Sequence, residues 1–393
     1  MKVPDFDYSS DQFHKIIVPT PMSELYSNLL NRLVARKPVL LAGNTGTCKT
    51  IMINNYLSKL SPTSFDISCF NLSSRTSSND VQASLESCIE KRMGRRYGPI
   101  GGKDLVVFLD DVNMPQVDLY NTQQPIALLL TLIDQSIMYD RTKDLGEKII
   151  ENVSFVSAMC PSGGRSPLDP RFVARFCVFA IPEPSRECQY DIFSKILSSG
   201  FSHQENMVDL ITIATLDLFE NIRQKLPPTP TKFHYIFSIH DLSRLFEGIW
   251  LSECETFVEN QFCRLWSNEA QRIFMDRLNS EVDVSTFCSI LKQTVSKYFS
   301  GHEDEIIRSP YLFTNVGNAQ LSTVTRHMGN ESAQYKDMGN CKDLQRIVEK
   351  YLYEYNSETT HQQELNIVLF ESAIDHLIRL MRVLRKIRAG MHY

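Results

Sequence analysis

One segment constrains this chain more than any other. An apolar run ends at Ala42 and leads into Gly43-Asn44-Thr45-Gly46-Thr47-Cys48-Lys49-Thr50. A strand, a glycine-rich turn and Lys-Thr at the start of a helical pattern form the arrangement that cradles nucleotide phosphates. The backbone N–H groups of the turn would point at the phosphates. We expect Lys49 to reach the β- and γ-oxygens and the Thr50 hydroxyl to bind Mg²⁺.

One position in this loop departs from the usual pattern. The residue before the lysine is ordinarily Gly, where bare backbone can approach a phosphate, but here it is Cys48. A thiol at a helix N-terminus beside Lys49 is favoured as thiolate, which would repel phosphate and make nucleotide affinity sensitive to oxidation or alkylation. The alternative is a tolerated substitution whose side chain turns away from the phosphates.

Composition and charge argue against several classes of protein. The chain has 393 residues, of which 42% are hydrophobic, and its formal net charge is −5. That length suits two or three domains with real cores, and the acidic balance argues against a general nucleic-acid binder. The ten cysteines include no C-x-x-C pair, the first residues are polar, and the nine histidines lack ligand spacing. We therefore expect a soluble, cytosolic protein with no nucleic-acid partner, no membrane partner and no zinc site.

Strand and helix patterns alternate through the first half of the chain. Strands are predicted over 39–42, 65–72, 105–109, 149–159 and 177–181, of which 105–109 is wholly apolar, with helices over 22–36, 79–92 and 126–137. Near-continuous apolar strands are typical of a parallel sheet covered by helices on both faces. From Ser185 onward strand patterns cease, and helical periodicity is found over 192–196, 207–226, 239–251 and 258–278.

These patterns predict an α/β fold followed by an all-helical lid. We place a lead-in and first helix over 1–37, a large α/β subdomain with the phosphate loop over 38–184, and a helical lid over 185–300. A connector with an amphipathic helix at 366–386 is predicted over 301–393.

The second half of the predicted site is the strand that ends at Asp110 and Asp111. In such a Walker B strand the first carboxylate holds Mg²⁺ through water, and the next residue polarises the attacking water. The usual second residue is Glu, and Asp111 is one methylene shorter. Because a misplacement of about 1 Å can cost on the order of a hundredfold in rate, Asp111 is a candidate base of limited reach.

Several motifs resemble dynein heavy chain. They are Phe108-Leu109-Asp110-Asp111-Val112-Asn113-Met114-Pro115, the run from Tyr120 to Ile126, the run from Asn71 to Ser77, and Asp169-Pro170-Arg171-Phe172. Their order is similar to the third AAA+ module of an axonemal motor ring, and Val368-Leu369-Phe370 resembles the lead-in to the fourth. The resemblance implies a P-loop AAA+ sheet with a small lid, binding ATP or ADP with Mg²⁺. It also implies that the chain is a fragment, a truncated gene product or an orphan copy of one module.

The same resemblance assigns further positions and partners. The sensor at the end of the fourth strand falls at Cys160, and the second sensor at His240, with Arg244 one turn later as a substitute. Arg171 matches the arginine finger, which would reach the preceding module's nucleotide; its alternative is a surface pair with Asp169. Arg175 is a weaker candidate for the finger and is expected to be solvated. Implied partners are neighbouring AAA+ modules and other dynein chains, with microtubules only indirect, in the axoneme of a cilium or flagellum.

Three functions remain open from the sequence. Departures at Cys48, Asp111, Cys160 and His240 favour a regulatory module that binds nucleotide and hydrolyses it slowly or not at all. A competent ATPase would use Asp111 as base and an arginine from a neighbour. A structural spacer would have its nucleotide site closed by Cys48.

Overall fold

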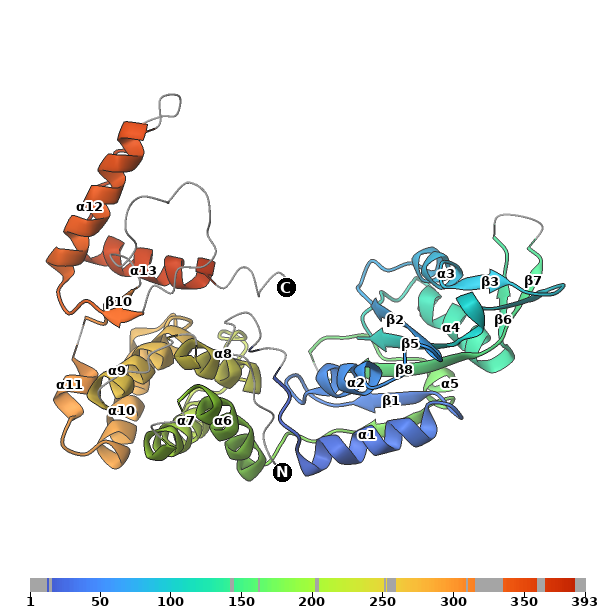
Figure 1. Cartoon of the computed structure of the whole chain (residues 1–393), viewed down its shortest axis with the longest axis horizontal. Helices are drawn as coiled ribbons and strands as arrows, with labels where there is room; N and C mark the ends of the chain where they lie inside the picture. Colours follow the sequence, from blue (N-terminus) through green and yellow to red (C-terminus); the bar gives the residue numbers. More distant parts are fainter. Residues whose placement is uncertain are drawn as a thin grey trace. The chain divides into compact units, whose positions relative to one another are not determined.

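The computed structural model describes residues 13, 16–141, 145–161, 163–201, 205–250, 252, 259–308, 310–314, 335–358 and 365–385. The described residues fall into two compact units (Figure 1). The first spans Pro19–Ser185, and the second contains the described residues before Pro19 together with those from Arg186 onward.

A five-stranded parallel sheet forms the centre of the first unit. Its strands are β1 (Val39–Ala42), β2 (Phe65–Asn71), β5 (Asp104–Asp110), β8 (Val153–Met159) and β9 (Cys177–Ala180), in the order β2-β5-β8-β1-β9. Register pairs Leu109 of β5 with Ser157 of β8, and Ala42 of β1 with Met159. The loop after β1, the acidic end of β5 and the end of β8 therefore meet at one edge of the sheet.

Helices cover both faces of this sheet (Figure 1). They are α1 (Pro21–Leu33), α2 (Lys49–Ser58), α3 (Ser78–Glu86), α4 (Gln124–Gln135) and the short α5 (Pro170–Val173). Alternate residues of β5 enter different cores: Val106 packs with residues of α1 and α2, whereas Val107 packs with residues of α3 and α4. This period of two buries β5 on both faces, and the predicted α/β sandwich is confirmed.

The sequence did not predict a second, four-stranded sheet in this unit. Its strands are β3 (Ile89–Lys91), β4 (Arg96–Pro99), β6 (Ile137–Tyr139) and β7 (Glu147–Ile150), in the order β3-β4-β7-β6. The helix expected over 79–92 is wrong in its last turn, because α3 ends at Glu86 and β3 pairs with β4. The strand expected over 149–159 is two strands, because Asn152 has φ 59° and turns the chain between the sheets.

The second unit contains the helical lid. Its helices are α6 (Arg186–Gly200), α7 (Glu205–Lys225), α8 (Ile239–Trp250), α9 (Glu259–Ala270), α10 (Glu281–Tyr298) and α11 (Glu303–Ile307). The core is aromatic, and the fully buried Trp266 donates its indole N–H to the Thr215 hydroxyl at 2.8 Å. The pattern expected over 258–278 is interrupted, since a π-helix at Gln271–Met275 follows α9; residue 258 lies outside the described residues.

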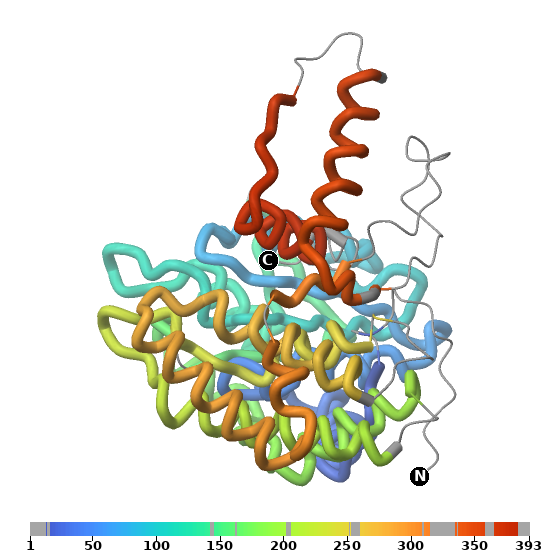
Figure 2. Tube along the Cα trace, turned by 90° about the vertical axis from the view of Figure 1, so that its left-hand side faces the viewer, coloured from blue at the N-terminus to red at the C-terminus, as the bar shows by residue number. Residues whose placement is uncertain are grey.

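Beyond the lid, two short strands and two helices follow. Strands β10 (Phe313–Thr314) and β11 (Lys336–Asp337) pair antiparallel, so the expectation of no strand after Ser185 is wrong. The amphipathic helix begins later than expected, as α13 (Glu371–Arg385), because the residues before it run extended beside α12 (Cys341–Glu358) (Figure 2). Residue 386 lies outside the described residues. Among the described helices, none is both long and apolar enough to cross a bilayer.

Candidate nucleotide site

The loop between β1 and α2 has the conformation that its glycines allow. Gly46 has φ 86°, in the left-handed region that favours glycine. A Cβ on Gly43 would lie 2.6 Å from the carbonyl oxygen of Ile181, a backbone atom that cannot easily move. Both glycines are therefore required by the loop geometry itself.

Cys48 occupies a left-handed position. It has φ 61° and ψ 21°, precedes the first residue of α2, and makes no side-chain cap hydrogen bond. This conformation costs roughly 1–2 kcal/mol for a residue with a Cβ, which is a second reason, besides close approach of phosphate, why glycine suits this position. The half-buried thiol lies 3.9 Å from the Gly46 carbonyl oxygen, a weak hydrogen bond within the loop.

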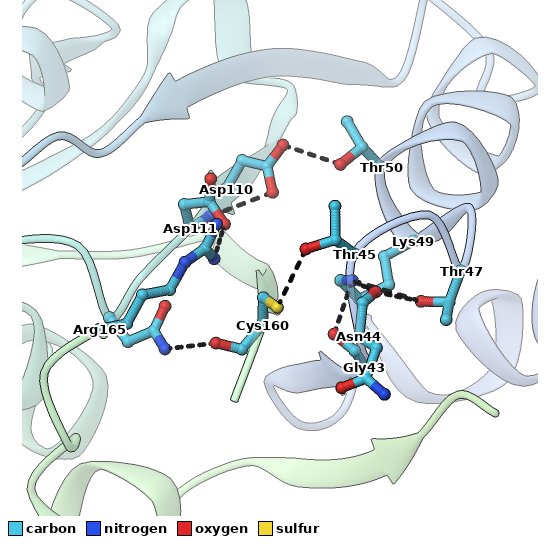
Figure 3. A network of polar contacts seen from close by, with 11 residues as sticks. Gly43, Asn44, Thr45, Thr47, Lys49, Thr50, Asp110, Asp111, Cys160 and Arg165 are labelled. Atoms are coloured by element: carbon cyan, nitrogen blue, oxygen red, sulfur yellow. Dashed lines mark hydrogen bonds and ion pairs between the residues drawn. The ribbon is translucent and has the colours of Figure 1, made fainter. Parts of the chain in front are cut away.

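Lys49 is buried and directed into the loop (Figure 3). Its ammonium donates to the carbonyl oxygens of Gly43 at 2.8 Å and Asn44 at 2.7 Å, and to the Thr47 hydroxyl at 3.3 Å. Burial lowers the pKa of Lys49, although the charges of Asp110 and Asp111 oppose this shift. Such a concentrated, poorly solvated positive charge suits a polyanion that would replace part of this acceptor set.

Thr50 and Asp110 are brought together as predicted for Mg²⁺. The Thr50 hydroxyl donates to Asp110 Oδ2 at 2.9 Å (Figure 3). Burial raises the pKa of the Asp110 carboxyl, and the hydrogen bond from Thr50 partly offsets that rise. A hydroxyl and a carboxylate, both oxygen ligands, fit a hard cation that keeps several of its waters and binds substrate phosphates.

The carboxylate of Asp111 is engaged by a residue that the sequence analysis missed. Arg165 Nη1 forms an ion pair with Asp111 Oδ1 (Figure 3). The backbone N–H of Asp111 donates to Asp110 Oδ1 at 3.1 Å, and its φ is 53°. The signal that could have found Arg165 is Gly163-Gly164 immediately before it, in the loop that follows β8. This loop lies at the same edge as the phosphate loop.

Cys160 lies directly after β8, beside the loop that contains Thr45. Its buried thiol is 3.5 Å from the Thr45 hydroxyl, and its carbonyl oxygen accepts from the Asn113 amide at 2.8 Å. The other side-chain polar atom of Asn113, Oδ1, is buried without a hydrogen-bond partner among the described residues. A buried acceptor of this kind is suited to a bound water or a ligand donor.

Arg171 and Arg175 both form surface ion pairs. Arg171 Nη2 lies 3.2 Å from Asp169 Oδ2 on an exposed side chain, the arrangement that the sequence left as the alternative to a finger. Arg175 Nη2 lies 2.9 Å from Asp134 Oδ1, and its side chain is 50% exposed, so Arg175 is solvated as expected and also forms a surface ion pair. The pair forms because Asp134, near the end of α4, faces the turn after α5.

The two lid positions lie on α8, in the other unit. His240 is exposed at the second residue of this helix, and Arg244 Nη1 is 3.9 Å from Asp241 Oδ1. The nearer partner of Asp241 is Arg277, whose Nη2 is 2.5 Å away. As contacts of the nucleotide, His240 and Arg244 stay predictions.

This geometry defines a class of protein: a P-loop AAA+ module with a helical lid. Comparison with known families agrees, since residues 6–184 match the P-loop containing dynein motor region and residues 210–309 match the AAA+ lid domain. The chain therefore contains a dynein heavy-chain AAA motor region followed by its lid.

Relatives of known name support this assignment. Dynein axonemal heavy chain 10 of Homo sapiens is 40% identical over 391 residues, 98% of this chain and 8% of its own length. Dynein-1-alpha heavy chain, flagellar inner arm I1 complex, of Chlamydomonas reinhardtii is 40% identical over 382 residues, again 8% of its length. The chain thus spans less than a tenth of these relatives, and which AAA module it matches is not shown by them.

Proposed function

We propose that this chain is a nucleotide-binding AAA+ module of a dynein-like motor, which binds ATP or ADP with Mg²⁺ and hydrolyses ATP poorly. The observation that carries the proposal is the set formed by Lys49, Thr50 and Asp110. A buried ammonium lies in the phosphate loop, and a hydroxyl pairs with a carboxylate at the edge of the sheet. Bound Mg²⁺ would neutralise phosphate charge there.

Weak hydrolysis is proposed from the residues at the remaining positions. Cys48 adds a strained Cβ where the backbone must approach phosphate. Asp111 is one methylene shorter than Glu, so its carboxylate reaches less far toward an attacking water, and in this structure it is paired with Arg165. Cys160 supplies a thiol at the sensor position. A regulatory role follows if nucleotide occupancy biases the closure of lid and large subdomain.

The setting of the module is also a proposal. Motif order favours the third module of an axonemal ring, with neighbouring modules and other dynein chains as partners in a cilium or flagellum. Arg171, exposed and paired with Asp169 among the described residues, would serve a neighbour's nucleotide by stabilising charge on the transferred phosphoryl group.

A competent ATPase is the second candidate. Asp111 lies next to Asp110 at the sheet edge, where a base would be needed, and release from Arg165 would free its carboxylate. The third candidate, a structural spacer, draws support only from the strained Cys48, and a spacer needs neither a buried Lys49 nor the contact between Thr50 and Asp110.

Calorimetric titration of the 393-residue chain with Mg·ATP and with Mg·ADP tests the proposal. We expect binding of both nucleotides, and loss of at least tenfold in affinity in Lys49→Ala. The matched control is Lys59→Ala, an exposed lysine at the far end of α2, which should leave binding unchanged. Absence of binding in the parent chain, with binding in Cys48→Gly, would establish the spacer instead.

A further inference from the structure

Arg165 lies in the predicted site with no role assigned to it. Its side chain is 21% exposed and that of its partner Asp111 is 42% exposed, so the ion pair is open to solvent on one side. The pair joins the loop after β8 to the end of β5, across neighbouring strands of the sheet. A ligand entering the site would meet both groups.

The position of Arg165 relative to the phosphate loop is informative. Figure 3 shows Arg165 and the two carboxylates on one side of the site, with Thr45, Lys49 and Thr50 on the other. Burial is the main cause of the lowered pKa of Lys49, and the positive charge of Arg165 adds to it only weakly. Two cations therefore face the same site from opposite sides, with Asp110 and Asp111 beside Arg165.

The chemistry of the guanidinium suits a second partner. Arginine forms bidentate hydrogen bonds with carboxylates and with phosphates in the same planar geometry. A terminal phosphate offers three oxygens and about two negative charges, whereas Asp111 offers a single charge. Arg165 can therefore leave Asp111 for a phosphate without changing the kind of contact that it makes.

The loop that carries Arg165 has a special backbone. Gly163 and Gly164 have φ 93° and 70°, and an added Cβ at either would meet nothing within 4 Å. Only backbone conformation, and not crowding, thus requires glycine at these two positions. The turn returns the chain toward the sheet edge and so directs Arg165 at Asp111.

We propose that Arg165 distinguishes ATP from ADP: it pairs with Asp111 when no terminal phosphate is present and binds the γ-phosphate of ATP in place of Asp111. This proposal rests on the nucleotide-binding function proposed above. It assigns to the loop after β8 the donor that Cys160 cannot supply well, because a thiol is a weak hydrogen-bond donor.

The competition between Asp111 and phosphate gives the sharpest test. In Arg165→Ala, affinity for Mg·ATP should fall at least tenfold while affinity for Mg·ADP changes less than threefold. In Asp111→Ala, Arg165 no longer has to leave a carboxylate, so Mg·ATP should bind more tightly and Mg·ADP should not. A purely structural pair would weaken both nucleotides alike in both variants.

Calorimetric titration of the 393-residue chain is the measurement, with Arg175→Ala as matched control. Arg175 also pairs with one aspartate in the same unit, but at α4 rather than at the sheet edge. Equal losses for ATP and ADP in Arg165→Ala, or no loss of ATP affinity, would overturn the role of Arg165 while leaving the nucleotide site intact. A parent chain that binds neither nucleotide would overturn the proposed function and this inference together.

Discussion

Replacement of Cys48 by glycine should stabilise the first unit. Cys48 has φ 61°, and the left-handed conformation costs a residue with a Cβ roughly 1–2 kcal/mol. Glycine removes this strain but gains freedom in the unfolded chain, which offsets about 0.4–1 kcal/mol. The net expectation is a gain on the order of 0.5–1 kcal/mol in the free energy of unfolding.

The assay must report on the first unit alone. Amide hydrogen exchange of the central strand β5, buried between β2 and β8, occurs through unfolding of that unit and gives its free energy directly. For a unit of this size, about 1 kcal/mol corresponds to a shift of about 2–4 °C in Tm. The thermal transition of the first unit, followed by exchange of the β5 amides, should therefore rise by about 1–4 °C in Cys48→Gly.

Two further variants separate backbone strain from the thiol. Cys48→Ala and Cys48→Ser keep a Cβ and therefore keep the strained φ, so both should stay within about 0.5 kcal/mol of the parent chain. If Cys48→Ala stabilised the unit as much as Cys48→Gly, the effect would belong to the thiol. A destabilised Cys48→Gly would show that the left-handed position carries no strain.

Two other predictions concern the second unit. Burial raises the pKa of Asp217, but hydrogen bonds from Lys297, Tyr298 and Arg186 outweigh it and lower the pKa to about 2. The resulting stabilisation, about 2 kcal/mol, is present above pH 4 and is lost as the pH falls toward 2. The difference in unfolding free energy between the parent chain and Asp217→Asn should therefore shrink between pH 4 and pH 2. Arg382→Ala removes one of the two ion pairs that the fully buried Glu269 forms with Arg272 and Arg382 among the described residues, and should cost about 3 kcal/mol by urea unfolding. Arg382→Met keeps the apolar stem and should lose less of the free energy of unfolding than Arg382→Ala if packing contributes. An unchanged free energy of unfolding in Arg382→Ala would show that the ion pair adds nothing to stability.

The sheet and the phosphate loop could be predicted because their signals are local. The five strands of the central sheet begin and end within a few residues of the predicted positions, and Val39–Ala42 is β1 without change. The central strands β1, β5 and β8 contain buried apolar runs that are visible in the residues themselves, whereas the edge strands β2 and β9 consist of half-buried and exposed residues. The contact between Thr50 and Asp110 follows from two such local signals, one after β1 and one at the end of β5, at the same edge of the sheet with β8 between the two strands.

The second sheet could not be predicted in the same way. Ile89–Lys91 continues the helical spacing of α3, and only its pairing with Arg96–Pro99 makes it a strand. That pairing depends on Gly94, whose φ of 64° forms the turn between the two strands. Likewise, Ile149 and Met159 lie in one segment with a strand-like pattern, and the left-handed Asn152 lies between the strands of the two sheets. Tertiary pairing decided both cases over local propensity.

The candidate site shows a related limit. Sequence position identified the two carboxylates. The partner of Asp111 is Arg165, which lies 54 residues later in the loop after β8. No pattern around Asp111 predicts that pairing, because it arises from the order of strands in the sheet. Gly163 and Gly164 mark a turn, yet they do not say where the turn leads.

The departures in the site have a common physical consequence. Three departures alter groups that would act on the terminal phosphate or on the attacking water: Cys48, Asp111 and Cys160. The loop and the cation site are kept in place by a second set of residues, which are Gly43, Gly46, Lys49, Thr50 and Asp110. A chain under no requirement to bind nucleotide would have no reason to keep a left-handed Gly46 or a desolvated Lys49, both of which cost stability. A chain that must hydrolyse ATP quickly would be expected to carry the longer Glu beside Asp110, and Asp111 is one methylene shorter. Binding that is sensitive to the terminal phosphate, with slow chemistry, is the function that reconciles both sets of residues.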